Sequence, residues 1–149
     1  MNSQIIVQLI LKFKNFAVFH NYMNTLKGKV ITGLGTGKKF LGIKEYFSQF
    51  ETILGASPFP GTLNLKVDPN ERKSFLSALE SDKTNPFEKV GRKYYSVEYF
   101  KISIKSIPCL LIIPEKTHHD ESIIEIISEK NLRNTLNLKD NSSIEIKYR

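Results

Sequence analysis

The sequence predicts a mainly β protein with one main domain, built from about six short strands in a sandwich or a barrel. Three observations support this. The 149 residues, of which 40% are hydrophobic, suffice for one buried core without disulfides. Runs of β-branched and aromatic residues recur between turn residues, and only one segment shows convincing helical spacing of its apolar side chains. Helices are therefore expected as additions to a β core.

The predicted strands follow from residue type and alternation. Residues 29–32 end at Gly33, and residues 62–67 alternate polar and apolar side chains after the turn signal Pro-Phe-Pro-Gly. The other runs are rich in β-branched and aromatic residues. They are residues 94–104, 109–113, 122–127 and 143–148.

One or two short helices are expected to pack on these strands. In residues 43–54 the apolar side chains recur at helical spacing, and Gly55 follows as a C-cap. Residues 72–79 and 129–136 give weaker helical signals.

The chain is expected to divide into an extension, residues 1–25, and a domain, residues 26–149. Residues 5–11 imitate the apolar core of a signal peptide, but lysines interrupt the run and no small-residue cleavage site follows, so we expect a short packed element. No run approaches the roughly 18 apolar residues that a membrane span needs. The single cysteine fits a reducing compartment, and we expect a cytoplasmic protein.

The positive charge lies in the first part of the chain. Residues 1–44 contain seven lysines and no acid, whereas the rest of the chain is balanced, so this part accounts for the net charge of +7. Such an excess attracts an anion but does not identify it, and a solvated lysine-rich face is an equally good interpretation.

The segment from Gly33 to Lys39 has the composition of a phosphate-binding loop. Glycines let backbone N–H groups approach phosphate oxygens, and lysines compensate the charge. The segment fits neither the Walker A loop nor the dinucleotide fingerprint, because Lys38 and Lys39 stand where those patterns need other residues. No helix is predicted to begin here, and a plain glycine-rich turn stays open as the alternative.

Two further polar positions suggest a ligand site. Thr62 and Asn64 are two residues apart, so a strand places both on one face, where their oxygens would suit Mg²⁺ held together with a nucleotide phosphate. Both side chains can equally satisfy the backbone beside a turn. Glu125 is a lone carboxylate in an apolar run and must face either a polar cleft or, on an edge strand, water.

These segments together resemble the archaeal CTP-dependent riboflavin kinases. The resemblance covers about residues 26–148, with four blocks in the family's order and spacing. The blocks are Gly33 to Leu41, Leu54 to Leu65, Pro114 to Ile127 and Leu132 to Asp140. It implies a closed six-stranded β-barrel of the cradle-loop, riboflavin-synthase-like type. This chain departs from the family in having Asn141-Ser142 where Gly-Asp is usual, and at Lys130 and Asn131.

The resemblance also implies roles for individual residues. Thr62 and Asn64 match the Mg²⁺ ligands, Thr117 and Glu125 match flavin contacts, and Lys38 and Glu125 are the candidate catalytic residues. Two segments match nucleotide contacts for CTP or CDP. They are Gly33, Leu34, Gly35, Thr36, Gly37 and Lys38, and Lys130, Asn131, Leu132 and Arg133.

The implied activity is transfer of the γ-phosphate of CTP to the 5′-hydroxyl of riboflavin, which gives FMN and CDP. The expected cofactor is Mg²⁺, the expected partners are these two substrates, and we expect a monomer that binds neither nucleic acid nor a membrane. Two alternatives stay open at this point: a small barrel that binds nucleic acid, and a flavin carrier without catalysis. Against the first, the basic side chains do not interleave with aromatic ones.

Overall fold

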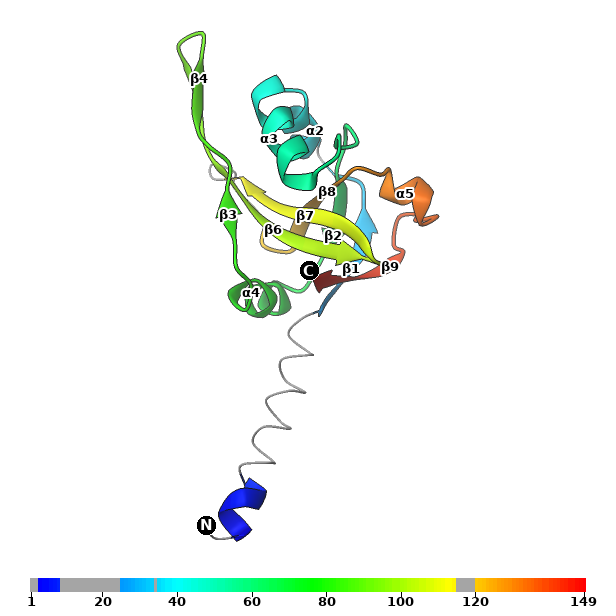
Figure 1. The fold of residues 1–149 in the computed structure, drawn as a ribbon. Helices are drawn as coiled ribbons and strands as arrows, with labels where there is room; N and C mark the ends of the chain where they lie inside the picture. The colour runs from blue at the N-terminus through cyan, green and yellow to red at the C-terminus, as the bar shows by residue number, and fades with distance from the viewer. Residues whose placement is uncertain (1–2, 9–24, 34, 115–119) are drawn as a thin grey trace.

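Six antiparallel strands close into a barrel in the computed structural model, which describes residues 3–8, 25–33, 35–114 and 120–149. Within these ranges the strand order is β6-β7-β8-β2-β1-β9, and β9 pairs again with β6 to complete the ring (Figure 1). The strands are β1 (Thr25–Ile31), β2 (Leu63–Lys66), β6 (Val97–Ile104), β7 (Ile107–Pro114), β8 (Ile123–Ser128) and β9 (Ser143–Tyr148). The closed six-stranded barrel predicted from the family resemblance is confirmed.

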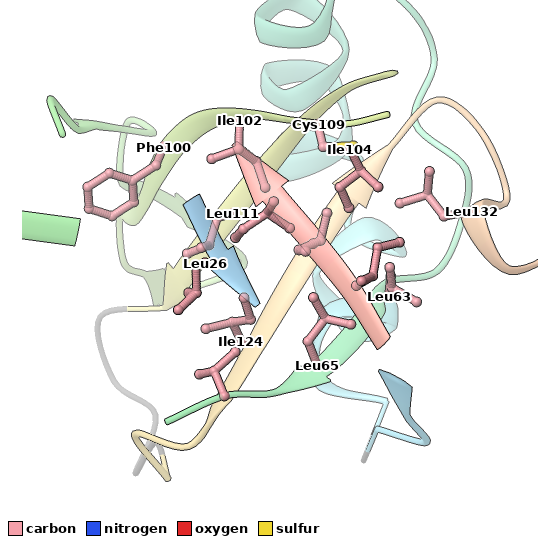
Figure 2. Close-up of a cluster of buried hydrophobic side chains, with 14 of the residues drawn as sticks. Leu26, Leu63, Leu65, Phe100, Ile102, Ile104, Cys109, Leu111, Ile124 and Leu132 are labelled. Atoms are coloured by element: carbon pink, nitrogen blue, oxygen red, sulfur yellow. The ribbon is translucent and has the colours of Figure 1, made fainter. Parts of the chain in front are cut away.

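The interior of the barrel is apolar. Alternate residues of each strand point inward, as Leu63 and Leu65 do on β2 and Ile124 and Ile126 do on β8. Figure 2 shows such side chains meeting in the space that the strands enclose. Phe75, from helix α4 (Pro69–Ser77), joins this cluster and is 1% exposed. Burial of these side chains supplies the main stabilisation of the fold.

A second apolar layer covers the outside of part of the barrel. Helices α2 (Thr36–Leu41) and α3 (Lys44–Leu54) lie over this face (Figure 1). Tyr46 of α3 is buried there, makes edge contacts with Phe40, Phe87 and Tyr94, and donates a hydrogen bond from its hydroxyl to the carbonyl of Tyr95 at 2.6 Å. Strands β7 and β8 are therefore buried on both faces, which explains why they read as nearly continuous apolar runs.

The helix predictions can be compared with the structure element by element. The expected helix of residues 43–54 is α3, and its C-cap Gly55 has φ 74°, the left-handed conformation that favours glycine. The two weaker signals correspond to α4 and to the short α5 (Leu132–Thr135). The expectation that no helix begins in the glycine segment is wrong, because α2 begins at Thr36.

The sequence patterns did not predict three short strands as separate elements. They are β3 (Asp82–Lys83), which pairs with β6, and the hairpin of β4 (Phe87–Lys89) and β5 (Arg92–Tyr94). The predicted strand of residues 94–104 is thus divided between β5 and β6. Phe87 and Tyr94 stack across the hairpin, with ring centroids 4.8 Å apart, and so attach it to the outer apolar layer.

The beginning of the chain differs from the prediction. Residues 3–8 are helical and exposed, with Ile5 and Val7 51% and 54% exposed, so the expected packed element is wrong for this described part. None of the helices in the described ranges has the length and apolar character needed to cross a membrane.

Candidate functional site

Thr62, Asn64 and Glu125 lie together on the outer face of the barrel. Leu63 and Leu65 point into the core, so Asn64 points outward, and Glu125 is its register partner on the neighbouring strand β8. The Asn64 amide donates to the Thr62 hydroxyl at 3.3 Å. The prediction that Thr62 and Asn64 share one face is confirmed, and the fold adds a carboxylate beside them.

The glycine segment covers this polar group at very short range. A Cβ placed on Gly33 would lie 2.1 Å from Nδ2 of Asn64, and one placed on Gly37 would lie 2.1 Å from Cγ2 of Thr62 and 3.0 Å from Oε2 of Glu125. A side chain at either position would therefore force Asn64 or Thr62 to shift. Gly33 and Gly37 are therefore needed for the close approach of the segment to β2 and β8.

Gly35 has a different role in the same segment. Its φ is +81°, which disfavours other residues, yet a Cβ there would meet no atom within 4 Å. Gly35 turns the chain from β1 into α2 and faces open space. The segment is thus more than a plain turn, because Gly33 and Gly37 pack against the polar group while Gly35 between them contacts no other part of the chain.

Glu125 is the least satisfied group in this arrangement. The side chain is 6% exposed, and within the described ranges its buried Oε2 has no hydrogen-bond partner. Burial raises the pKa of the carboxyl group. Because β8 lies between β7 and β2, the edge-strand interpretation of Glu125 is wrong, and the carboxylate faces the space below the glycine segment.

An unpartnered buried carboxylate is costly unless a cation, a proton or a ligand meets it. The neutral oxygens of Thr62 and Asn64 beside it are of the hard kind that Mg²⁺ accepts. Among the residues that the structure describes, no group of three or more His, Cys, Asp or Glu side chains forms a metal cluster. The donor set therefore fits a cation that brings further oxygen ligands from a bound molecule.

The second predicted segment, from Lys130 to Arg133, lines a pocket that reaches Thr62. The pocket has a volume of about 170 Å³, and Phe59, Gly61 and Ser128 contribute to its wall. The Asn131 side chain caps α5 by accepting a hydrogen bond from the Asn134 backbone N–H at 3.2 Å. Leu132 is 4% exposed and packs in the inner cluster, while Arg133 is partly exposed.

The structure brings some predicted residues together and leaves others apart. Thr62, Asn64, Glu125 and the glycine segment form one group, and the segment from Lys130 adjoins it through the pocket. Lys38 is on α2 and exposed. Leu34 and Thr117 lie outside the described residues, so their predicted contacts stay predictions.

Sequence reasoning missed one residue of this region as a functional position. Asp140 accepts hydrogen bonds from Arg133, Nη2 to Oδ1 at 2.8 Å, and from the hydroxyl of Thr32. Its carboxylate therefore links Thr32, which precedes Gly33, to Arg133 of the second segment through hydrogen bonds. Its place in the fourth block, close to Arg133, was the only signal in the sequence.

Comparison with known proteins identifies the family of the chain. The family model CTP-dep_RFKase, described as "Domain of unknown function DUF120", matches residues 30–148. The chain therefore belongs to the CTP-dependent riboflavin kinase family, as the resemblance predicted.

Several similar proteins carry the name riboflavin kinase. The chain is 38% identical over 123 residues to the one from Methanospirillum hungatei, an alignment that covers 81% of this chain and 56% of that protein. It is 37% identical over 124 residues to that of Methanocorpusculum labreanum, covering 81% and 55%. It is 40% identical over 124 residues to that of Ignicoccus hospitalis, covering 82% and 69%. The chain thus spans little more than half the length of the first two relatives.

Proposed function

We propose that this chain catalyses transfer of the γ-phosphate of CTP to the 5′-hydroxyl of riboflavin, which yields FMN and CDP. Membership of the family and the riboflavin kinase name of its relatives support the reaction type. The observation that carries the proposal is the polar group of half-buried Thr62 and buried Asn64 and Glu125, which lies under a glycine segment in an otherwise apolar face.

The proposed metal ligands are Thr62 and Asn64. Both oxygens are neutral, so they would hold Mg²⁺ firmly only when nucleotide phosphates complete its ligands. When bound there, Mg²⁺ would neutralise charge that develops on the transferring phosphoryl group. The two side chains are held in place by their shared hydrogen bond and by the glycine segment above them.

The nucleotide would lie between two segments, the glycine segment from Gly33 to Lys38 and the segment from Lys130 to Arg133 that contains the start of α5. Backbone N–H groups from Gly33 to Lys38 would face the phosphates, and the pocket lined by Lys130 to Arg133 would take the rest of the nucleotide. Lys38 ends the glycine segment and is exposed, so its ammonium is free to meet an incoming phosphate. Phosphoryl transfer depends mainly on positioning and charge neutralisation, which these residues can supply without a covalent intermediate.

Glu125 is the proposed group on the flavin side, together with Thr117. A carboxylate whose pKa is raised is a better base than an ordinary glutamate. In the proposed step the riboflavin oxygen forms a bond to the γ-phosphorus, the bond from that phosphorus to the β,γ-bridging oxygen breaks, and Glu125 accepts the hydroxyl proton. CDP leaves with the bridging electron pair.

The test is incubation of the chain with riboflavin, Mg²⁺ and either CTP, ATP, GTP or UTP, followed by measurement of FMN. We expect CTP to support FMN formation at a rate well above that with ATP. We further propose that the protein acts in the cytoplasm and as a monomer. Equal rates with ATP would contradict the choice of donor. Riboflavin binding without FMN formation would favour a flavin carrier, and duplex DNA binding without kinase activity would favour a nucleic-acid-binding barrel.

A further inference from the structure

Asp140 connects the two segments that the proposed function assigns to the nucleotide. Arg133 donates from Nη2 to Oδ1 of Asp140 at 2.8 Å and to the carbonyl of Ile31 at 3.1 Å. The Thr32 hydroxyl donates to the same carboxylate at 3.2 and 3.3 Å. Ile31 and Thr32 directly precede Gly33. One carboxylate therefore fixes both the start of the glycine segment and the guanidinium on α5.

The backbone holds Asp140 firmly at this position. The Asn141 N–H donates to the Val30 carbonyl at 2.8 Å, and the Val30 N–H donates to the Ser142 carbonyl at 2.9 Å. Asn141 has φ 71°, a left-handed conformation that asparagine tolerates better than most residues. The turn is thus attached to β1 on both sides of Asn141, which places the neighbouring Asp140 side chain beside Thr32.

Arg133 keeps part of its hydrogen-bonding capacity for another group. Its two contacts within the described residues both use Nη2. Among the described residues no hydrogen bond involves its Nε or Nη1, so these N–H groups are uncommitted. Arg133 also lines the pocket that reaches Thr62. A guanidinium with one nitrogen anchored and the others uncommitted suits an anionic or carbonyl-bearing ligand in that pocket.

We infer that Asp140 is a positioning residue for the nucleotide: it holds Arg133 and the start of the glycine segment in the geometry that binds CTP, without itself touching CTP. This inference rests on the proposed function. Stability alone does not account for the pair, because side chains 36% and 57% exposed form an ion pair of little energetic value.

Electrostatics and positioning predict opposite effects of removing Asp140. Loss of a negative charge beside an anion-binding pocket makes the pocket more positive, so charge alone predicts tighter nucleotide binding. Positioning predicts weaker binding, because Arg133 loses its anchor and must be ordered by the ligand itself. The sign of the change therefore separates the two explanations.

The experiment is calorimetric titration of CDP, with Mg²⁺ present, into the wild-type chain and Asp140→Ala. We expect the dissociation constant for CDP to rise about threefold to tenfold and that for riboflavin to stay unchanged. Glu80→Ala, which removes an exposed acid outside the pocket, is the matched control and should bind CDP like the wild type. Arg133→Ala combined with Asp140→Ala should lose less CDP affinity than the sum of the two single losses, since part of the effect of Asp140 passes through Arg133.

Each outcome bears on the inference. Equal or tighter CDP binding by Asp140→Ala, or full additivity in the double variant, would overturn it while leaving the proposed function intact. Failure of the wild-type chain to bind CDP at all would overturn the proposed function and the inference with it. If Asp140→Ala does not fold, Asp140→Asn keeps the shape and one acceptor oxygen, and the same sign of change in CDP affinity decides the question.

Discussion

The two nucleotide segments are built in opposite ways. The glycine segment lies so close to Thr62, Asn64 and Glu125 that a side chain at Gly33 or Gly37 would force these neighbours to shift, and Asn64 and Glu125 beneath it are buried. The segment around Arg133 is partly exposed and is organised by a helix cap and an ion pair. The first segment depends on packing and the second on directed hydrogen bonds. Substitutions in the first should therefore reduce catalysis strongly, whereas substitutions in the second should change affinity moderately.

The largest effect is expected from Gly37→Ala. The added methyl group would lie 2.1 Å from Cγ2 of Thr62, so Thr62 and the glycine segment must move apart. Overpacking of this kind costs about 1–3 kcal/mol of stability, and misplacement of reacting groups by about 1 Å lowers rates about 100-fold. Thermal unfolding and the rate of FMN formation measure the two effects.

Gly55→Ala is the control for this substitution. Unlike Gly37, Gly55 has a positive φ, but a Cβ there would meet no atom within 4 Å, so strain of about 1 kcal/mol without loss of activity is expected. Near-normal activity of Gly37→Ala would show that the tight cover over Thr62 is unimportant for catalysis.

The next effect concerns Lys38, which is exposed on α2. If its ammonium neutralises the transferring phosphoryl group, Lys38→Met removes a charge-assisted contact and lowers kcat/KM for CTP by about 10- to 150-fold. The dissociation constant for riboflavin should barely change. Lys39→Met, the neighbouring exposed lysine, provides the comparison. An unchanged kcat/KM in Lys38→Met would show that Lys38 has no catalytic role. Weaker riboflavin binding in this variant would show that the glycine segment binds the flavin and not the nucleotide.

A smaller effect is expected from Asn64→Leu, which keeps the side-chain volume under Gly33 but removes the amide oxygen. The variant should fold and should need more Mg²⁺ for half-maximal FMN formation, because one metal ligand is lost. The measurement is a Mg²⁺ titration of the initial rate at a fixed CTP concentration. An unchanged Mg²⁺ requirement would exclude Asn64 as a ligand.

Glu125→Gln tests the buried carboxylate through binding and stability. Riboflavin binding should weaken more than CTP binding, because Glu125 is proposed to lie on the flavin side, and kcat should fall as well, because the proposed acceptor of the hydroxyl proton is lost. Burial raises the pKa of Glu125 in the folded state, so ionisation opposes folding. This cost is absent below the ordinary glutamate pKa and complete above the raised one, so stability is lost as pH rises between them.

Removal of the ionisable group should therefore make the ligand-free protein more stable at neutral pH, with a smaller gain at acidic pH. Denaturant unfolding of both proteins at two pH values measures this difference. A variant that is less stable than the wild type at neutral pH would show that the carboxylate has a stabilising partner in solution.

The six strands of the barrel could be predicted because they carry their own signals, whereas their closure into a barrel was implied by the family resemblance. The alternation at residues 62–67 placed Thr62 and Asn64 on one face, and the structure has them there. The start of α2 was missed because Gly37 lies inside its first turn, and glycine is a poor helix former. The position of Glu125 stayed open because only the strand order decides whether β8 is an edge strand.

Asp140 illustrates what local patterns cannot reach. Its hydrogen bond to Thr32 joins residues 108 positions apart, and closure of the barrel by β1 and β9 brings them together. Apart from its place in the fourth family block, nothing in the sequence around Asp140 distinguishes it from an ordinary turn aspartate. Contacts of this kind depend on which strands pair, so the local sequence cannot predict them.

The central proposal is that Thr62 and Asn64, on the outer face of the barrel, bind Mg²⁺ jointly with the nucleotide. The most direct test is to measure Mg²⁺ binding to the chain by calorimetry, first without nucleotide and then with CDP. We predict weak Mg²⁺ binding alone and much tighter binding with CDP, because Thr62 and Asn64 offer only neutral oxygens. Tight Mg²⁺ binding by the nucleotide-free protein, or no change on adding CDP, would contradict the account.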